Sequence, residues 1–241
     1  MDALALSRRL AALPALAMQR AALREHLEAL DDASAARLCG ELVRRGSGGA
    51  PYDLALLALS AILDENALGY ERHEAIYAAA HALGDEPLQR LLLSAQPPPP
   101  GSPKRAPIPD RAEITLGERK SLARGSRLSR ELIDRLLRDP DPAVLEILLL
   151  NPRVTEEDVV RLAARRPTSA AAQRVVFHSE RFIVRYGVKR ALAFNPYTPS
   201  DLAARLAPLL TKPDLISLAE DGQVREMVRQ AARELLGRSP A

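Results

Sequence analysis

The feature that most constrains the fold is a helix stop followed by a helix start, which occurs twice in the second half of the chain. Asn151-Pro152 ends an apolar segment, and Thr155-Glu-Glu-Asp158 follows with the pattern of a capping box. The order recurs at Asn195-Pro196 and Thr198-Pro-Ser-Asp201. Because proline lacks an amide donor and cannot continue a helix, each motif separates two helices. The repetition predicts a periodic helical architecture.

A second correspondence gives the length of the period. Val184-Arg-Tyr-Gly-Val188-Lys189 matches Val224-Arg-Glu-Met-Val228-Arg229 at an offset of 40 residues, and the two Asn-Pro stops are 44 residues apart. A period of this length with two helices per unit is typical of stacked helical hairpins. Such hairpins bury their apolar faces only by stacking. The helices that we expect here include 116–124, 130–138, 143–150 and 181–194.

These motifs resemble a known repeat family. Asp139-Pro-Asp-Pro-Ala-Val144, the segment from Asn151 to Ala163, and Ala193-Phe-Asn-Pro-Tyr-Thr-Pro-Ser-Asp-Leu202 look like the variant leucine-rich repeats and related HEAT-like repeats of bacterial proteins. The resemblance covers roughly residues 130–236. It implies helices that end at an Asn-Pro turn, followed by helices that start at a Thr or Pro cap. The longer period in this chain favours the HEAT-like geometry, and the resemblance says little about activity.

A proline-rich segment divides the chain. Six prolines and a glycine fall between Pro97 and Pro107, so no helix is expected there. The predicted organisation is a helical N-terminal domain at 1–95, a linker at 96–110 and a HEAT-like repeat domain at 111–241. A plain spacer is the favoured interpretation of the linker, and a ligand for an SH3-like domain is the alternative.

The N-terminal half also reads as helical. Helices are expected near 14–30, 35–45, 51–63, 70–83 and 86–95, with Ser34 as an N-cap. Alanine and leucine dominate the chain, and aromatic residues make up only 3% of it. This composition suits closely packed helices better than a β-sandwich. The predicted fold class is therefore all-α, with a helical-hairpin, HEAT-like solenoid in the C-terminal half.

Cysteine usage and hydropathy predict a location. Cys39 is the only cysteine, which excludes an internal disulfide and fits a reducing compartment. No stretch reaches about eighteen uninterrupted apolar residues, so no membrane span is expected. The N-terminus does not read as a signal peptide, because Pro14 and Gln19 interrupt its apolar stretch. We expect a cytoplasmic protein that does not bind membranes.

No catalytic or metal-binding constellation stands out. His73, Tyr77 and His81 recur at helical spacing, but eight residues span about 12 Å of helix, too far for both imidazoles to bind one ion. Cys39 falls within a predicted helix, where a small buried thiol is the usual case. The sequence therefore predicts no catalytic residue, no metal and no cofactor, and a protein that is not an enzyme.

Basic residues at four-residue spacing suggest a binding surface. Two such rows are candidates for contact with a partner or with phosphate: Arg181, Arg185 and Lys189, and then Arg225, Arg229 and Arg233. In stacked repeats equivalent positions become neighbours, so the rows would form one basic patch in a groove. Only two repeats carry such a row, since Leu145 and Leu149 occupy the equivalent positions of the preceding repeat. A solvated helix face is the competing interpretation.

Three functions remain open from the sequence. The leading hypothesis is a non-enzymatic scaffold that binds a partner protein, and an acidic segment would suit its groove. The alternative is nucleic-acid binding through phosphate contacts, although no aromatic residues interleave the basic ones. A third hypothesis is that one half of the chain docks on the other. Residues 1–100 hold 9 Lys and Arg against 13 Asp and Glu, whereas residues 101–241 hold 25 against 18, so the two halves have opposite net charge. Partner identity and oligomeric state are not predicted.

Overall fold

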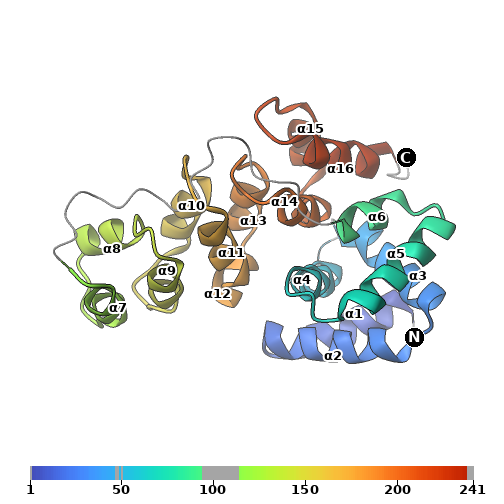
Figure 1. Cartoon of the computed structure of the whole chain (residues 1–241), viewed down its shortest axis with the longest axis horizontal. Helices are drawn as coiled ribbons and strands as arrows, with labels where there is room; N and C mark the ends of the chain where they lie inside the picture. The colour runs from blue at the N-terminus through green and yellow to red at the C-terminus, as the bar shows by residue number, and fades with distance from the viewer. Residues whose placement is uncertain (1, 47–48, 50, 94–113, 238–241) are drawn as a thin grey trace. The chain divides into compact units, whose positions relative to one another are not determined.

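The computed structural model describes residues 2–46, 49, 51–93 and 114–237 (Figure 1). These residues form helices and connecting turns, with no strand among them, which confirms the all-α prediction. The chain divides into two compact units, Met1–Gln96 with Ser200–Ala241 (unit 1) and Pro97–Pro199 (unit 2). The predicted division placed everything after residue 110 in one domain, so the two divisions differ from residue 200 onward. The predicted linker at 96–110 lies outside the described residues.

Unit 1 contains nine α-helices within its described residues. They are α1 (Ala3–Ala11), α2 (Leu16–Ala29), α3 (Asp32–Arg45), α4 (Tyr52–Asp64), α5 (Tyr70–Ala82), α6 (Glu86–Leu92), α14 (Ser200–Leu206), α15 (Lys212–Glu220) and α16 (Glu226–Gly237), with a 3₁₀ turn at Ala207–Leu209. Every residue from 55 to 63 in α4 is buried. Since an all-round apolar helix must be covered on all sides, α1, α2, α3 and α14 pack around α4.

The N-terminal predictions hold for most helices and fail at two points. The sequence reading missed α1, which begins after an N-cap at Asp2 whose carboxylate accepts from the Ala5 amide at 2.7 Å. The cap of α3 is Asp31 rather than Ser34, because the Asp31 carboxylate accepts from the Ser34 amide at 2.9 Å. In both cases a short acidic side chain satisfies an unpaired amide in the first helical turn.

Unit 2 repeats a group of three helices. Its described helices are α7 (Leu116–Arg124), α8 (Arg130–Leu136), α9 (Pro142–Leu149), α10 (Glu156–Ala164), α11 (Ala170–His178), α12 (Glu180–Ile183) and α13 (Tyr186–Ala193). The first and last members pack together in each group, as α7 on α9 and α10 on α13 (Figure 1). The second group has the four-residue α12 in addition to its three main helices. The 40–44-residue interval therefore contains three main helices, and the expectation of two per unit is wrong.

The caps that start these helices repeat with the same period. Thr115 and Thr155 each form a capping box with the acidic residue three positions later, as predicted for Thr155. Ser129 and Ser169 each cap the second helix of their group through the side-chain oxygen. Both pairs are 40 residues apart. The periodicity read from the sequence is thus carried by hydrogen-bonding side chains at helix starts.

The two asparagines of the Asn-Pro stops make equivalent contacts. The buried Asn151 amide donates to the carbonyls of Ala123 at 3.0 Å and Gly125 at 2.8 Å, at the end of α7. The buried Asn195 amide donates in the same way to two carbonyls at the end of α10, at 2.6 and 2.9 Å. Each asparagine oxygen also accepts an amide two residues later. The Asn-Pro motif therefore fastens the end of each group to its own first helix.

Two local predictions in this region are wrong. The helix expected at 181–194 is interrupted, since α12 ends at Ile183 and α13 begins at Tyr186. The expected cap at Thr198 does not form: α14 begins at Ser200, and the buried Thr198 hydroxyl has no hydrogen-bond partner in the described part of the chain. Capping patterns give the approximate start of a helix, and the local packing decides its final boundary.

Candidate anion-binding groove

Arg181, the first of the predicted basic residues, is engaged within unit 2. Its guanidinium donates to the carbonyl oxygens of Asn151 at 2.9 Å and Val154 at 3.0 Å. It also lies over the Phe182 ring, 4.6 Å from the ring centre. These contacts hold the turn after α9, so the structure gives Arg181 a role in joining helices.

The other two members of that row differ in exposure. Arg185 precedes the first turn of α13 and forms a loose ion pair with Glu156 at 3.8 Å, with 60% of its side chain exposed. Lys189 is only 4% exposed. A buried ammonium cannot meet a partner without rearrangement, so Lys189 is poorly placed for binding.

The second predicted row lies along α16 in unit 1. Arg229 and Arg233 both form ion pairs with Glu226, the latter at 3.0 Å. Arg233 also donates to the Ala219 carbonyl at 3.3 Å. Arg225 stands before the first turn, where its carbonyl accepts from the Arg229 amide. Since the two rows belong to different units, a single basic patch made of both rows stays a prediction.

Arginines close several helix ends in this protein. The side chains that donate to carbonyls at or just after a helix C-terminus are Arg72, Arg165, Arg166, Arg181, Arg205 and Arg233. The last carbonyls of a helix lack internal partners and carry the negative end of the helix dipole. A guanidinium suits them because its planar fork offers several donors in fixed directions. Part of the arginine content is therefore structural.

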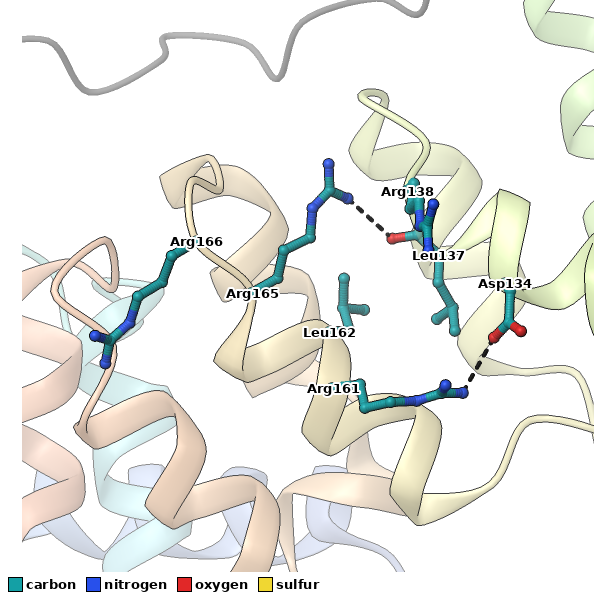
Figure 2. Close-up of a pocket in the computed structure, with 7 residues that line it drawn as sticks. All are labelled: Asp134, Leu137, Arg138, Arg161, Leu162, Arg165 and Arg166. Carbon is teal, nitrogen blue, oxygen red and sulfur yellow. Dashed lines mark hydrogen bonds and ion pairs between the residues drawn. The ribbon is translucent and has the colours of Figure 1, made fainter.

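A groove in unit 2 collects arginines at the ends of α8 and α10. It has a volume of about 360 Å³, and its lining residues are Asp134, Leu137, Arg138, Arg161, Leu162, Arg165 and Arg166 (Figure 2). Four of these seven carry a positive charge and one a negative charge. Leu137 and Leu162 also line the groove, but they are only 7% and 4% exposed. The accessible part of the groove is therefore mainly polar and positively charged.

Arg161 forms one side of the groove and is held by two carboxylates. It donates to Asp134 at 3.0 Å across the groove and to Asp158 at 2.6 Å within its own helix (Figure 2). Burial alone would raise the pKa of Asp158. Hydrogen bonds from Arg130, the Thr155 amide and Arg161 outweigh that effect and hold the pKa well below its ordinary value. Asp158 is thus an ionised anchor that fixes Arg161.

Arg165 and Arg138 lie at the other side without a carboxylate partner among the described residues. Arg165 reaches the Leu137 carbonyl at 3.4 Å, which is long for a hydrogen bond (Figure 2). Burial and, next, the positive charge of Arg138 lower the pKa of Arg165. Arg138 is exposed, and no hydrogen bond or ion pair holds its guanidinium in the described part of the chain. An anion placed here would relieve the repulsion between the two cations.

Arg166 turns away from the other three arginines in Figure 2 and donates to the Phe194 carbonyl at 2.7 Å. It lines the groove through its stem while its charged end closes α13. This leaves Arg138 and Arg165 as the pair best placed for a ligand. Guanidinium groups bind carboxylates and phosphates through two parallel hydrogen bonds.

The sites considered for metal or nucleophilic chemistry have structural contacts. His73 pairs with the Leu92 carbonyl at 2.7 Å, and no cluster of three or more metal-ligating side chains occurs among the described residues. Cys39 is buried, and burial raises the pKa of its thiol to about 12. A thiol in this environment stays protonated and unreactive.

The sequence reading did not single out the groove residues. Arg138 and Arg165 are 27 positions apart, so neither helical spacing nor the 40-residue offset connects them. Only the packing of one group against the next brings the end of α8 and α10 to one groove. A signal was present within one helix, because Arg161 and Arg165 are four residues apart.

Comparison with known proteins found no family model, curated protein or solved structure that matches this chain. The resemblance to HEAT-like repeats therefore stays a prediction. Within the described residues, none of the helices is long and apolar enough to cross a membrane.

Proposed function

We propose that this protein is a non-enzymatic interaction scaffold, and that unit 2 binds an acidic segment of a partner protein in the arginine groove. The observation that carries the proposal is the pair Arg138 and Arg165, two arginines that line the same groove and have no carboxylate partner in the described residues. The lone buried Cys39 fits work in the reducing cytoplasm.

The composition of the groove favours a peptide over nucleic acid. Leu137 and Leu162 line it but are only 7% and 4% exposed. Binding of single strands relies on aromatic platforms, and none of the lining residues is aromatic. Asp134 and Asp158 already bind Arg161, so the groove has few cations left for a continuous phosphate backbone. The acidic-segment hypothesis therefore takes precedence over phosphate-backbone binding.

The test is fluorescence anisotropy with the full chain. A short labelled peptide that alternates leucine with glutamate and aspartate is titrated from low to physiological salt, beside a neutral peptide and labelled DNA and RNA. The double variant Arg138→Gln/Arg165→Gln should weaken binding of the acidic peptide by about tenfold or more, since each lost charge-assisted hydrogen bond contributes about 1.5–3 kcal/mol.

The matched control is Arg124→Gln/Arg153→Gln, which removes two exposed charges of the same unit outside the groove. It should keep most of the affinity. Equal losses in both double variants would show that only net charge matters and would contradict a defined groove. Binding of nucleic acid that is tighter than that of the peptide, and lost with Arg138 and Arg165, would put the alternative function first.

A further inference from the structure

We infer that the arginine groove binds a phosphorylated side chain of the partner segment, with the phosphoryl group between Arg138 and Arg165. This inference rests on the proposed function, because it specifies the anion that the same groove takes.

Only part of the positive charge in the groove is available to a ligand. Asp134 and Asp158 already bind Arg161, at 3.0 and 2.6 Å. Arg166 is directed to the Phe194 carbonyl. The remaining pair, Arg138 and Arg165, lines the same groove and supplies two positive charges to it. The groove is therefore suited to an anion of charge near −2.

A phosphate monoester matches this charge better than a carboxylate does. It carries about −1.5 to −2 charges at pH 7 and three acceptor oxygens, so that it can accept from both guanidiniums at once. A carboxylate has one charge and would leave part of the repulsion between the two arginines uncompensated. The lowered pKa of Arg165, caused by burial and by Arg138, reflects that repulsion.

The existing contact of Arg165 is easily exchanged. Its distance of 3.4 Å to the Leu137 carbonyl lies beyond the range of a strong hydrogen bond, whereas the contact between Arg166 and Phe194 is 2.7 Å. A phosphoryl oxygen can thus replace the carbonyl at little cost. Arg138, which is exposed, can turn toward the same oxygen atoms.

The surroundings favour one phosphorylated side chain over a polyanion. Leu137 and Leu162 line the groove but are only 7% and 4% exposed, so they offer a ligand little apolar surface. A volume of about 360 Å³ holds a few side chains. Because Arg161 is already paired with Asp134 and Asp158, and Arg166 donates to the Phe194 carbonyl, the groove has no further arginine to offer to the next phosphate of a polyanion.

The test uses the full chain and three labelled peptides that differ at one position, which is serine, glutamate or phosphoserine within a leucine-containing acidic frame. We expect the phosphoserine peptide to bind about tenfold more tightly than the glutamate peptide at pH 7.5. This advantage should shrink at pH 5, because the second pKa of the phosphate is about 6. Arg138→Gln should remove the advantage, and Arg153→Gln should preserve it.

Each outcome decides between the two levels of the proposal. Equal binding of the phosphoserine and glutamate peptides, with both tighter than the serine peptide, would overturn the phosphoryl inference and leave the acidic-segment function standing. Binding of none of the three peptides would overturn both. Inorganic phosphate alone, if it binds as tightly as the phosphopeptide, would show a small-anion site and overturn the peptide source. An advantage that survives Arg138→Gln would contradict the assigned position.

Discussion

The two units use the same pair of residue types, arginine and aspartate, in opposite environments. In unit 1, Arg205 lies inside the core, with only 4% of its side chain exposed, and binds Asp64 at 3.3 Å and Asp201 at 3.2 Å. In unit 2, Arg161 binds Asp134 and Asp158 at a rim where 57% of its side chain is exposed. The Arg205 cluster is thus part of the core of unit 1. The Arg161 cluster lies at the surface of unit 2, beside arginines that a partner can reach.

The difference shows why the count of basic residues is a poor guide to a binding surface. Arg205 also donates to the Leu91 carbonyl at 3.1 Å, so its charge and its donors are used inside unit 1. Arg138 and Arg165 have no carboxylate partner in the described residues. The two regions therefore differ in whether their arginines have carboxylate partners. Four predictions test how much such internal contacts contribute to stability.

The largest expected effect is on the core cluster. Arg205→Met should lower the free energy of unfolding by about 3–5 kcal/mol, because Asp64 and Asp201 would lose their shared guanidinium while remaining buried. Urea denaturation followed by circular dichroism measures this. A loss below about 1 kcal/mol would mean that water or rearrangement compensates the carboxylates, and the comparison of the two units would then fail.

The next effect concerns the two asparagines that fasten the groups of unit 2. Asn151→Ala and Asn195→Ala should each cost about 2–4 kcal/mol, because each strips two carbonyls of their donor. Equivalent repeats predict similar losses at both positions in thermal or urea unfolding. Asn→Asp variants serve as controls, since they keep the acceptor oxygen but bring a negative charge to the carbonyls. A harmless Asn→Asp change would contradict the donor role.

A smaller and pH-dependent effect is expected at Asp158. Its pKa is lowered in the folded protein, so ionised Asp158 stabilises the fold above the unfolded pKa of about 3.9. That stabilisation is lost as the pH falls below this value toward the folded pKa. Asp158→Asn should therefore cost about 1.5–3 kcal/mol at pH 7, and this cost should begin to shrink as the pH falls below about 3.9. Urea midpoints of both proteins at several pH values test this, and a constant difference would rule it out.

The smallest effect is expected for an exposed pair. Arg24 and Glu28 lie one helical turn apart at 3.5 Å, with half of each side chain exposed. Arg24→Ala should change the free energy of unfolding by about 0.3–0.5 kcal/mol only. A loss as large as that of Arg205→Met would show that burial does not set the order of these effects.

Much of the fold was predictable from local patterns. Proline stops and capping residues placed most helices, and the capping box at Thr155 is present as predicted. Local patterns placed a helix at 143–150, where α9 lies. They could not show that 181–194 is divided into α12 and α13, because no proline or glycine marks the break before Tyr186. They also could not assign Ser200–Ala241 to unit 1, which depends on contacts with helices more than a hundred residues away.

The sequence predicted a basic groove at six residues, and none of the six lines the arginine groove of unit 2. Several of them are engaged elsewhere: Arg181 holds the turn after α9, and Lys189 is buried. Spacing along a helix reveals which residues share a face. It does not reveal whether a carboxylate or a carbonyl in another helix already takes the charge, as Asp158 does for Arg161.

The most direct test of this account measures two quantities on Arg138→Gln, the affinity for the acidic peptide and the free energy of unfolding. We predict that the affinity falls about tenfold while the free energy of unfolding stays within about 0.5 kcal/mol of the parent protein, because the side chain is exposed and serves a ligand. The opposite result, unchanged affinity with a clear loss of stability, would show that the arginines of the groove hold the fold and would contradict the account.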